Sequence, residues 1–299
     1  MKHIFRFVRT ERTVGLMTNI QIITDAASDL SKAEQQEYGI DIIPIKIMAD
    51  GQEYLSGVNM FSDEFYTVLE SCDEIPKTSQ PTTMEIYELF KKHIDAGKEI
   101  LVISLSSDAS GTFNNMHLAK NMILEETPDA VIEILDSRRF SYIYGWAAME
   151  ATKMAEEGLS VQEIKENVVA FMERFEVAIM PNSLTYLEKG GRINKASLVF
   201  GNMLDIVPVL TIKNGLIEAI GKVRGRKKLA KKLAGYIQEH APDQSGKTML
   251  VLNGRMEEET EELIGYLKEM YPGVTIKRGD VGPIIATHIG PVFAAFYEL

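Results

Sequence analysis

Two hydroxyl-rich segments are the strongest candidates for a binding site in this sequence. They span residues 77–82 and 104–113, and each joins an apolar run to a helical pattern. The residues of interest in them are Thr78, Ser79, Ser110 and Gly111. Free N–H groups and the helix dipole favour anions at such junctions, hydroxyls can donate to an anion, and a glycine allows close backbone approach. The pattern indicates an anion site, with plain helix capping as the alternative.

A histidine and an arginine are candidates to complete this site. His288 follows the apolar run 283–287, which we interpret as a strand, and precedes Gly290, from which we predict the last helix. A histidine at a strand end can face a cleft and interact with an anion. Arg192 follows a double glycine, and its guanidinium suits bidentate contact with carboxylate or phosphate. The alternatives are a structural histidine and a solvated loop.

A serine and a histidine at one site also suggest a second chemistry. Ser110 as nucleophile with His288 as base would make the protein a hydrolase acting on an acyl ester. The sequence around Ser110 lacks the Gly-x-Ser-x-Gly elbow of many such enzymes. The hydrolase is therefore the second hypothesis.

The elements that must position these residues alternate between strand and helix in the first half of the chain. The runs IQIIT, DIIPIKI, EILVISL and AVIEILD are each followed by an amphipathic segment. Helix starts are marked at capping-box spacing by Ser31/Glu34, Thr82/Glu85 and Ser160/Glu163. This order predicts an α/β fold with a mostly parallel, Rossmann-like sheet and flanking helices.

The pattern changes near residue 174. Two β-rich runs meet at Asn214-Gly215, a hairpin signal that the first half lacks. We also expect a short helix near 195–204 and longer helices over 226–240 and 256–270. The prediction is an N-terminal arm over 1–18, an α/β domain over 19–173 and a mixed α+β domain over 174–299, with the ligand site between the two domains. The arm, a disordered segment or start-site extension, is expected to be dispensable over residues 1–16.

Composition excludes several classes of protein. The net charge of -11 over 299 residues argues against nucleic-acid binding, which normally needs a basic domain. A single cysteine fits a reducing cytoplasm, and no apolar run reaches the ~18 residues of a membrane span. The one dense basic run, residues 224–232, begins at Arg224 and is either a solvated helix face or a docking site for an acidic partner.

The ordered set of short motifs resembles the DegV family, whose fatty-acid-binding members are carrier subunits of bacterial fatty-acid kinase. The motifs are Thr24-Asp25-Ala26-Ala27-Ser28-Asp29-Leu30, Lys77-Thr78-Ser79-Gln80-Pro81, Ser107-x-x-Ser110-Gly111-Thr112, Asp136-Ser137, Tyr186-Leu187-x-x-Gly190-Gly191-Arg192-Ile193, Lys222-Val223-Arg224-Gly225-Arg226-Lys227-Lys228 and His288-x-Gly290-Pro291. They lie in family order from about residue 19 to residue 295.

This resemblance implies a long-chain fatty acid, for example palmitate, in a tunnel between the domains, and no other cofactor. Its carboxylate would lie near Thr78, Ser79, Ser110 and His288, with Arg192 close by. A separate ATP-dependent fatty-acid kinase would phosphorylate that carboxylate, with Arg224 at the handover surface. Transient contact with a membrane, without a membrane span, is a further expectation. The sequence departs from the family at Ile143, Val207, Val292 and Ala295, where added side chains would shorten the tunnel.

Overall fold

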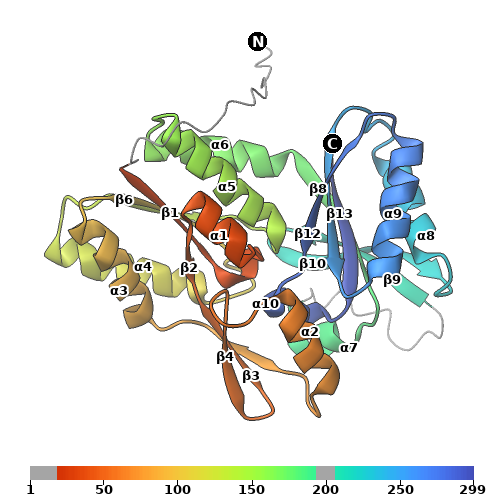
Figure 1. Ribbon diagram of the computed structural model, residues 1–299, viewed down its shortest axis with the longest axis horizontal. Helices are drawn as coiled ribbons and strands as arrows, with labels where there is room; N and C mark the ends of the chain where they lie inside the picture. The colour runs from red at the N-terminus through yellow and green to blue at the C-terminus, as the bar shows by residue number, and fades with distance from the viewer. Residues whose placement is uncertain (1–18, 193–205) are drawn as a thin grey trace.

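The computed structural model describes residues 19–192 and 206–299, which form three sheets surrounded by helices (Figure 1). The first sheet is parallel, with the strand order β2-β1-β6-β7. Its strands are β1 (Ile20–Asp25), β2 (Asp41–Ile43), β6 (Glu99–Ser104) and β7 (Ile132–Asp136). Helices α3 (Thr83–Asp95) and α4 (Thr112–Glu126) cover one face, and α5 (Tyr142–Glu156) and α6 (Val161–Glu173) cover the other. The predicted parallel sheet with flanking helices is confirmed.

Alternation along the strands divides the apolar side chains between these two faces. Ile23 and Val102 belong to the core beneath α3 and α4, where they join Phe90. Ile22 and Leu101 point to the opposite face, beneath α5 and α6. A parallel sheet buried on both faces needs such nearly continuous apolar strands.

The helix starts follow the local sequence signals. Capping boxes are present at Ser31 for α1 (Lys32–Tyr38), at Thr82 for α3 and at Ser160 for α6, as the spacing predicts. A short 3-10 helix, η1 (Ala26–Ser28), links β1 to α1. In each box the side chains satisfy N–H groups that would otherwise lack partners in the first helical turn.

The second sheet is mixed and has the strand order β10-β9-β8-β13-β11-β12. Its strands are β8 (Phe175–Pro181), β9 (Ile206–Lys213), β10 (Leu216–Arg224), β11 (Thr248–Gly254), β12 (Thr275–Asp280) and β13 (Val292–Glu298). Helices α8 (Leu229–His240) and α9 (Glu257–Met270) cover one face. The other face shares a core with the first sheet, with Ile179 and Phe296 in the same cluster as Leu101. The mixed second half is as predicted, whereas the domain boundary at residue 174 stays a prediction.

The β9–β10 hairpin turns at Asn214 and Gly215, whose φ angles of 51° and 75° suit an Asn-Gly turn. This confirms the hairpin prediction. β8 pairs with β9 at Ile179 and Leu210, and the register of β10 shifts between Ala219 and Gly221. Residues 211–219 therefore make no registered pair with β8, although β8 and β9 lie side by side.

A third sheet was not expected from the sequence. It is antiparallel, with the order β4-β3-β5, and its strands are β3 (Ile45–Ala49), β4 (Gln52–Ser56) and β5 (Lys77–Ser79). The run DIIPIKI, which reads as one strand, is divided at Pro44 between β2 and β3. Proline has no N–H to donate to a ladder, so the chain can change sheets there. Helix α2 (Ser62–Ser71), which follows β4 in the chain, contacts α10 (Pro283–Ile289).

The prediction for the last two elements is wrong. The run 283–287 is not a strand but part of helix α10, and the expected helix from Gly290 is instead strand β13. Pro283 occupies the first turn of α10, where its missing N–H costs nothing and its fixed φ suits a helix. β13 lies between β8 and β11, so its apolar run is buried on both faces. His288 therefore lies near the end of a helix, not of a strand.

Other boundaries also differ from the predictions. α8 begins at Leu229 rather than at residue 226, so Arg224 ends β10 instead of leading into the helix. Residues 185–190, which the sequence did not assign to a helix, make the short helix α7 (Thr185–Gly190), and Gly191 ends it at φ 67°. The expected helix near 195–204 and the N-terminal arm lie outside the described residues. No helix in the described ranges is long and apolar enough to cross a membrane.

Candidate functional site

A cavity of about 340 Å³ lies between the first sheet, the third sheet, α10 and the β9–β10 hairpin. Ligand sites commonly measure roughly 300–1,000 Å³. Its apolar lining consists of Ile45, Leu105, Ala109, Phe140, Ile217, Ile284, Ile285 and Ile289. Its other lining residues are Thr78, Gln80, Ser107, Asp108, Ser110, Gly111, Arg192 and His288. Small-molecule sites usually combine apolar side chains, which contact most of the ligand, with polar groups that fix its orientation.

The cavity brings together nearly all of the predicted site residues. Thr78, Ser110, Gly111, Arg192 and His288 line it, although they come from four separate segments of the chain. Ser79 does not line it. Its neighbour Thr78 faces inward, and because side chains alternate along a strand, Ser79 of β5 is exposed on the other face.

The loop between β6 and α4 contributes Ser110 and Gly111. The Ser110 and Thr112 hydroxyl oxygens lie 2.9 Å apart, and Thr112 N–H donates to Ser110 Oγ at 3.2 Å. A side chain at position 111 would collide with Gln80, since a Cβ there would lie 2.2 Å from its Oε1. Gly111 thus permits close packing against Gln80, a lining residue that the sequence reasoning did not select.

His288 reaches the cavity from α10. Its Nε2 lies 2.9 Å from Thr78 Oγ1, at hydrogen-bond distance. Burial and, to a smaller extent, the positive charge of Arg192 lower the pKa of His288 to about 4, whereas the Gly190 backbone acts in the opposite sense. At neutral pH the imidazole is therefore uncharged, and it serves the site as a hydrogen-bonding group rather than as a cation.

Arg192 carries the permanent positive charge of the described cavity lining. Its Nη1 donates to the Gly190 carbonyl at 2.7 Å, and its Nε lies 3.4 Å from the Ala109 carbonyl. These carbonyls orient the guanidinium without neutralising its charge. Among the described residues no carboxylate pairs with Arg192, and Asp108, the one acidic lining residue, pairs instead with Arg138 at 2.7 Å. The charge of Arg192 is thus available to an anionic ligand.

Close backbone packing positions this pair of groups. A Cβ at Gly190 would lie 2.9 Å from Nδ1 of His288, so only glycine lets α7 approach α10 so closely. The approach places Arg192, two residues later, next to the histidine. The functional importance of Gly190 could be suspected from the double glycine, but its partner could not.

Two buried aspartates, Asp25 and Asp29, hold in place the loop and the helix that carry Ser110 and His288. The sequence did not predict this role for them. Asp25 accepts from Leu105 N–H and from the Tyr144 hydroxyl, both at 2.7 Å, and so fixes the start of the loop that carries Ser110. Burial raises the pKa of Asp25 above its usual value despite these bonds.

Asp29 has a similar role at the start of α10. It accepts from the Ser141 hydroxyl and packs so closely on Gly282 that a Cβ there would lie 2.4 Å from its Oδ1. Burial raises the pKa of Asp29 to about 8. The two carboxyl groups position the binding loop and α10, and they do not line the cavity.

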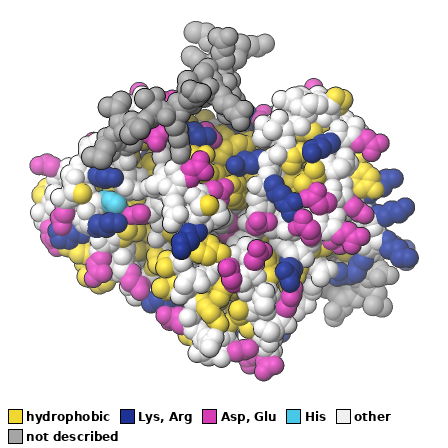
Figure 2. Space-filling model, viewed as in Figure 1, with side chains coloured by type: hydrophobic (Ala, Val, Ile, Leu, Met, Phe, Trp, Pro, Cys, Tyr) yellow, Lys and Arg dark blue, Asp and Glu magenta, His cyan; other side chains and the backbone are white. Residues whose placement is uncertain are grey.

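The remaining predicted residues lie away from the cavity. Arg224 is exposed at the end of β10, and its carbonyl accepts from Lys232. Figure 2 shows Lys and Arg side chains gathered at the right-hand margin, over α8 of Figure 1. The four positions that depart from the family pattern, Ile143, Val207, Val292 and Ala295, are buried in the cores, and none lines the cavity.

Comparison with known proteins identifies the family. Residues 19–299 match the family described as "Uncharacterised protein, DegV family". A DegV domain-containing protein of Clostridium perfringens is 33% identical over 271 residues, covering 91% of this chain and 95% of that protein. A stearic acid-binding protein of Eubacterium ventriosum has a TM-score of 0.82 at 27% identity and covers 93% of this chain and 98% of its own. A DegV family protein of Thermus thermophilus, described as binding a fatty acid, has a TM-score of 0.81 at 25% identity, with 95% and 100% covered. The chain therefore belongs to the DegV family.

Proposed function

We propose that this protein binds one long-chain fatty acid, with the carboxylate against Thr78, Ser110, Arg192 and His288 and the acyl chain along the apolar wall of the cavity. The observation that carries the proposal is the meeting of one unneutralised cation, a neutral histidine and hydroxyl groups in a cavity that also has an apolar wall. Solved relatives described as fatty-acid-binding support the same class of ligand.

The physical chemistry of a fatty acid fits both parts of this site. Burial of the ~14 methylenes of a C16 chain contributes roughly 11 kcal/mol before ordering costs, at about 0.8 kcal/mol per methylene. A buried carboxylate needs several donors to replace its water. Arg192 supplies charge, and the hydroxyls of Thr78 and Ser110 supply hydrogen bonds from two separate segments.

The hydrogen bonds favour a carrier over the hydrolase. Ser110 pairs with Thr112, and the histidine pairs with Thr78, so the expected Ser110–His288 pair is not formed. The Thr78 hydroxyl is the one that meets the imidazole, so ester turnover is also tested in Thr78→Val, and the solved relatives described as fatty-acid-binding favour a carrier. We therefore propose a protein that holds a fatty acid without converting it.

We further propose that the bound carboxylate is presented to a separate ATP-dependent fatty-acid kinase in the cytoplasm. Arg224 is exposed and lies outside the cavity, so its charge is available to a partner protein. Complementary charges across an interface guide encounter and register.

Calorimetry with palmitate and its methyl ester tests the binding proposal. The free acid is expected to bind about tenfold or more tightly, because only the acid offers a negative charge to Arg192. Arg192→Met should abolish this preference while leaving ester binding unchanged. Equal affinity of the wild type for acid and ester would contradict the proposed orientation, and turnover of the ester that is lost in Ser110→Ala would establish the hydrolase instead.

A further inference from the structure

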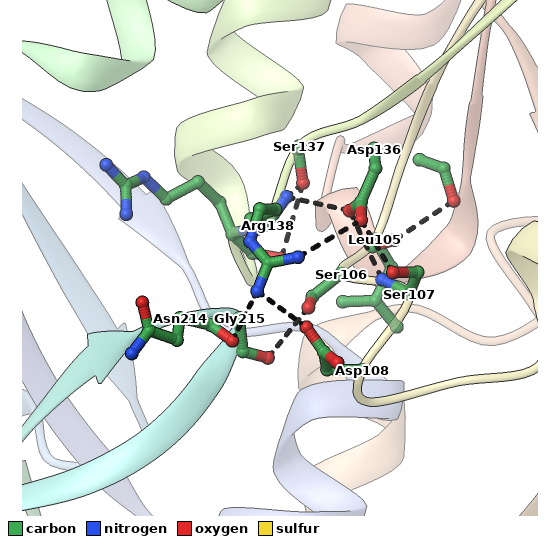
Figure 3. A network of polar contacts seen from close by, with 11 residues as sticks. Leu105, Ser106, Ser107, Asp108, Asp136, Ser137, Arg138, Asn214 and Gly215 are labelled. Carbon is green, nitrogen blue, oxygen red and sulfur yellow. Dashed lines mark hydrogen bonds and ion pairs between the residues drawn. The ribbon is translucent and has the colours of Figure 1, made fainter.

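A polar network holds the tip of the β9–β10 hairpin against the loop that lines the cavity (Figure 3). Ser106 Oγ donates to the Gly215 carbonyl at 2.7 Å, and Arg138 Nη2 donates to the Asn214 carbonyl at 2.6 Å. The same Arg138 nitrogen lies 2.7 Å from Oδ2 of Asp108, a lining residue. One arginine thus ties the hairpin tip to the cavity loop.

The loop side of this network is firmly anchored. Ser107 donates to the Asp136 carboxylate through its N–H at 3.2 Å and its hydroxyl at 2.6 Å. The backbone N–H of Arg138 also donates to Asp136, at 2.9 Å. The loop and Arg138 are therefore both fixed to the carboxyl end of β7. If the contact opens, the β9–β10 hairpin is the part that moves.

The hairpin has the features of a movable wall. Residues 211–219 make no registered pair with β8, and the irregularity between Ala219 and Gly221 interrupts the ladder at their base. Ile217 on this extension is buried and lines the cavity. Movement of the tip would remove Ile217 from the wall and open the apolar part of the cavity.

The Asp108 ion pair holds the Arg138 side chain in reach of the Asn214 carbonyl at the hairpin tip, and this pair can be weakened reversibly. The side chains of Arg138 and Asp108 are 50% and 42% exposed, so water and salt reach their ion pair. Exposed pairs of this kind contribute little to folding stability. The contact beside them is tight: a Cβ at Gly215, whose φ is 75°, would lie 2.5 Å from Ser106 Oγ and 2.7 Å from Asp108 Oδ2.

We propose that residues 211–219 form a lid over the ligand cavity, and that Arg138 and Asp108 form the latch that sets the rate at which a fatty acid enters and leaves. This inference rests on the proposed function. Arg138 touches no ligand in this account and acts only through the hairpin tip and the cavity loop.

Stopped-flow fluorescence with cis-parinaric acid, a fluorescent C18 fatty acid, tests the latch. Association is followed on mixing, and dissociation is followed on adding excess oleate. Arg138→Met should accelerate both rates by roughly three- to tenfold, the effect of one exposed ion pair and one hydrogen bond, and leave the equilibrium affinity within about threefold. Faster dissociation with a matching loss of affinity and unchanged association would overturn the lid, because the latch would then stabilise only the bound state.

Arg255→Met provides a matched control. Like Arg138, Arg255 has a positive φ. It pairs with Glu70 at 2.8 Å, and the two side chains are 47% and 53% exposed. Neither residue lines the cavity. Its variant should exchange ligand at the wild-type rate. Equal rates in wild type, Arg138→Met and Arg255→Met would refute the latch while leaving fatty-acid binding intact, whereas failure of the wild type to bind the probe would refute the proposed function itself.

Two further measurements separate the latch from a general loss of structure. Gly215→Ala should accelerate exchange without any change of charge, because its methyl group forces the tip off the loop. Raising salt from about 0.02 to 0.5 M should accelerate exchange in the wild type but not in Arg138→Met, since screening weakens an exposed ion pair. A wild-type exchange rate that does not respond to salt would overturn the role given to the ion pair, and melting temperatures near that of the wild type identify the variants that remain folded.

Discussion

The titration of His288 is the prediction that the structure determines most sharply. Burial and the neighbouring charge of Arg192 hold its pKa at about 4, against an ordinary value of 6.5. Between these two values the unfolded chain binds a proton that the folded protein does not. The stability of the folded state therefore falls as the pH decreases from 6.5 to 4, and it is unaffected by this group above 6.5.

The difference between the two pKa values sets the size of the effect. At 1.36 kcal/mol per pKa unit, it corresponds to about 3 kcal/mol lost by pH 4. His288→Gln removes the titrating group and keeps an amide that can hydrogen-bond to Thr78. The difference in unfolding free energy between wild type and variant should therefore shift by about 3 kcal/mol between pH 7 and pH 4, in favour of the variant at low pH.

Histidine NMR gives the most direct assay of this pKa. The chain has five histidines, and the signal lost in His288→Gln identifies the one of interest. That signal should remain in its neutral position down to about pH 5 in the free protein. On binding of palmitate its pKa should rise by about one unit or more, because a carboxylate at hydrogen-bond distance favours the charged imidazole. A midpoint near 6.5 in the free protein, or one that does not respond to palmitate, would refute this account of the site.

Three other predictions test the remaining parts of the site. Ser110→Ala and Thr78→Val should each weaken palmitate binding by about 1–3 kcal/mol in calorimetry, whereas the exposed Ser79→Ala should have no effect; equal losses in all three would misplace the cavity. Burial raises the pKa of Asp29 to about 8, so between pH 3.8 and 8 the unfolded chain releases this proton while the folded protein keeps it. The stability of the folded state therefore falls as the pH rises through this window. Asp29→Asn should therefore gain stability relative to wild type across this window in urea unfolding, and a constant difference would contradict that. Arg224→Ala should bind palmitate within a few-fold of wild type but lose acyl-phosphate formation in a coupled ATP assay with the kinase, and equal loss of both would place Arg224 in the ligand site.

Local signals in the sequence were sufficient for much of the fold. Helix starts at Ser31, Thr82 and Ser160 were predictable, because a capping box is made within four residues. The turn at Asn214 and Gly215 was predictable for the same reason, since both residues tolerate a positive φ.

Elements whose state depends on distant partners were not predictable in this way. The runs of α10 and β13 are both short and apolar, and such runs do not reveal their periodicity when every side is buried. Pro283 was the available signal for the helix, and it was overlooked. The third sheet is predictable only in part. Its β3–β4 hairpin turns at Asp50 and Gly51, whose φ angles of 45° and 80° suit a two-residue turn, so a local signal exists in the first half of the chain as well. The pairing of β3 with β5, about thirty residues apart, has no such local signal.

For the candidate site, the residue types were predictable from the sequence, whereas their arrangement in space was not. The residue types that suit a carboxylate could be chosen from the sequence, and Thr78, Ser110, Arg192 and His288 do meet at one cavity. The face of β5 that points inward depends on its register with β3, so Ser79 could not be separated from Thr78. The burial of His288 and its approach to Arg192 depend on packing between distant segments, so the depressed pKa of the histidine could not be anticipated.

Native mass spectrometry of the protein as purified from its host tests the central claim most directly. We expect a single adduct with the mass of one long-chain fatty acid, recovered as the free acid on extraction and greatly reduced in Arg192→Met. A protein that carries no acyl ligand and binds none when offered palmitate, or an adduct that Arg192→Met retains in full, would contradict it.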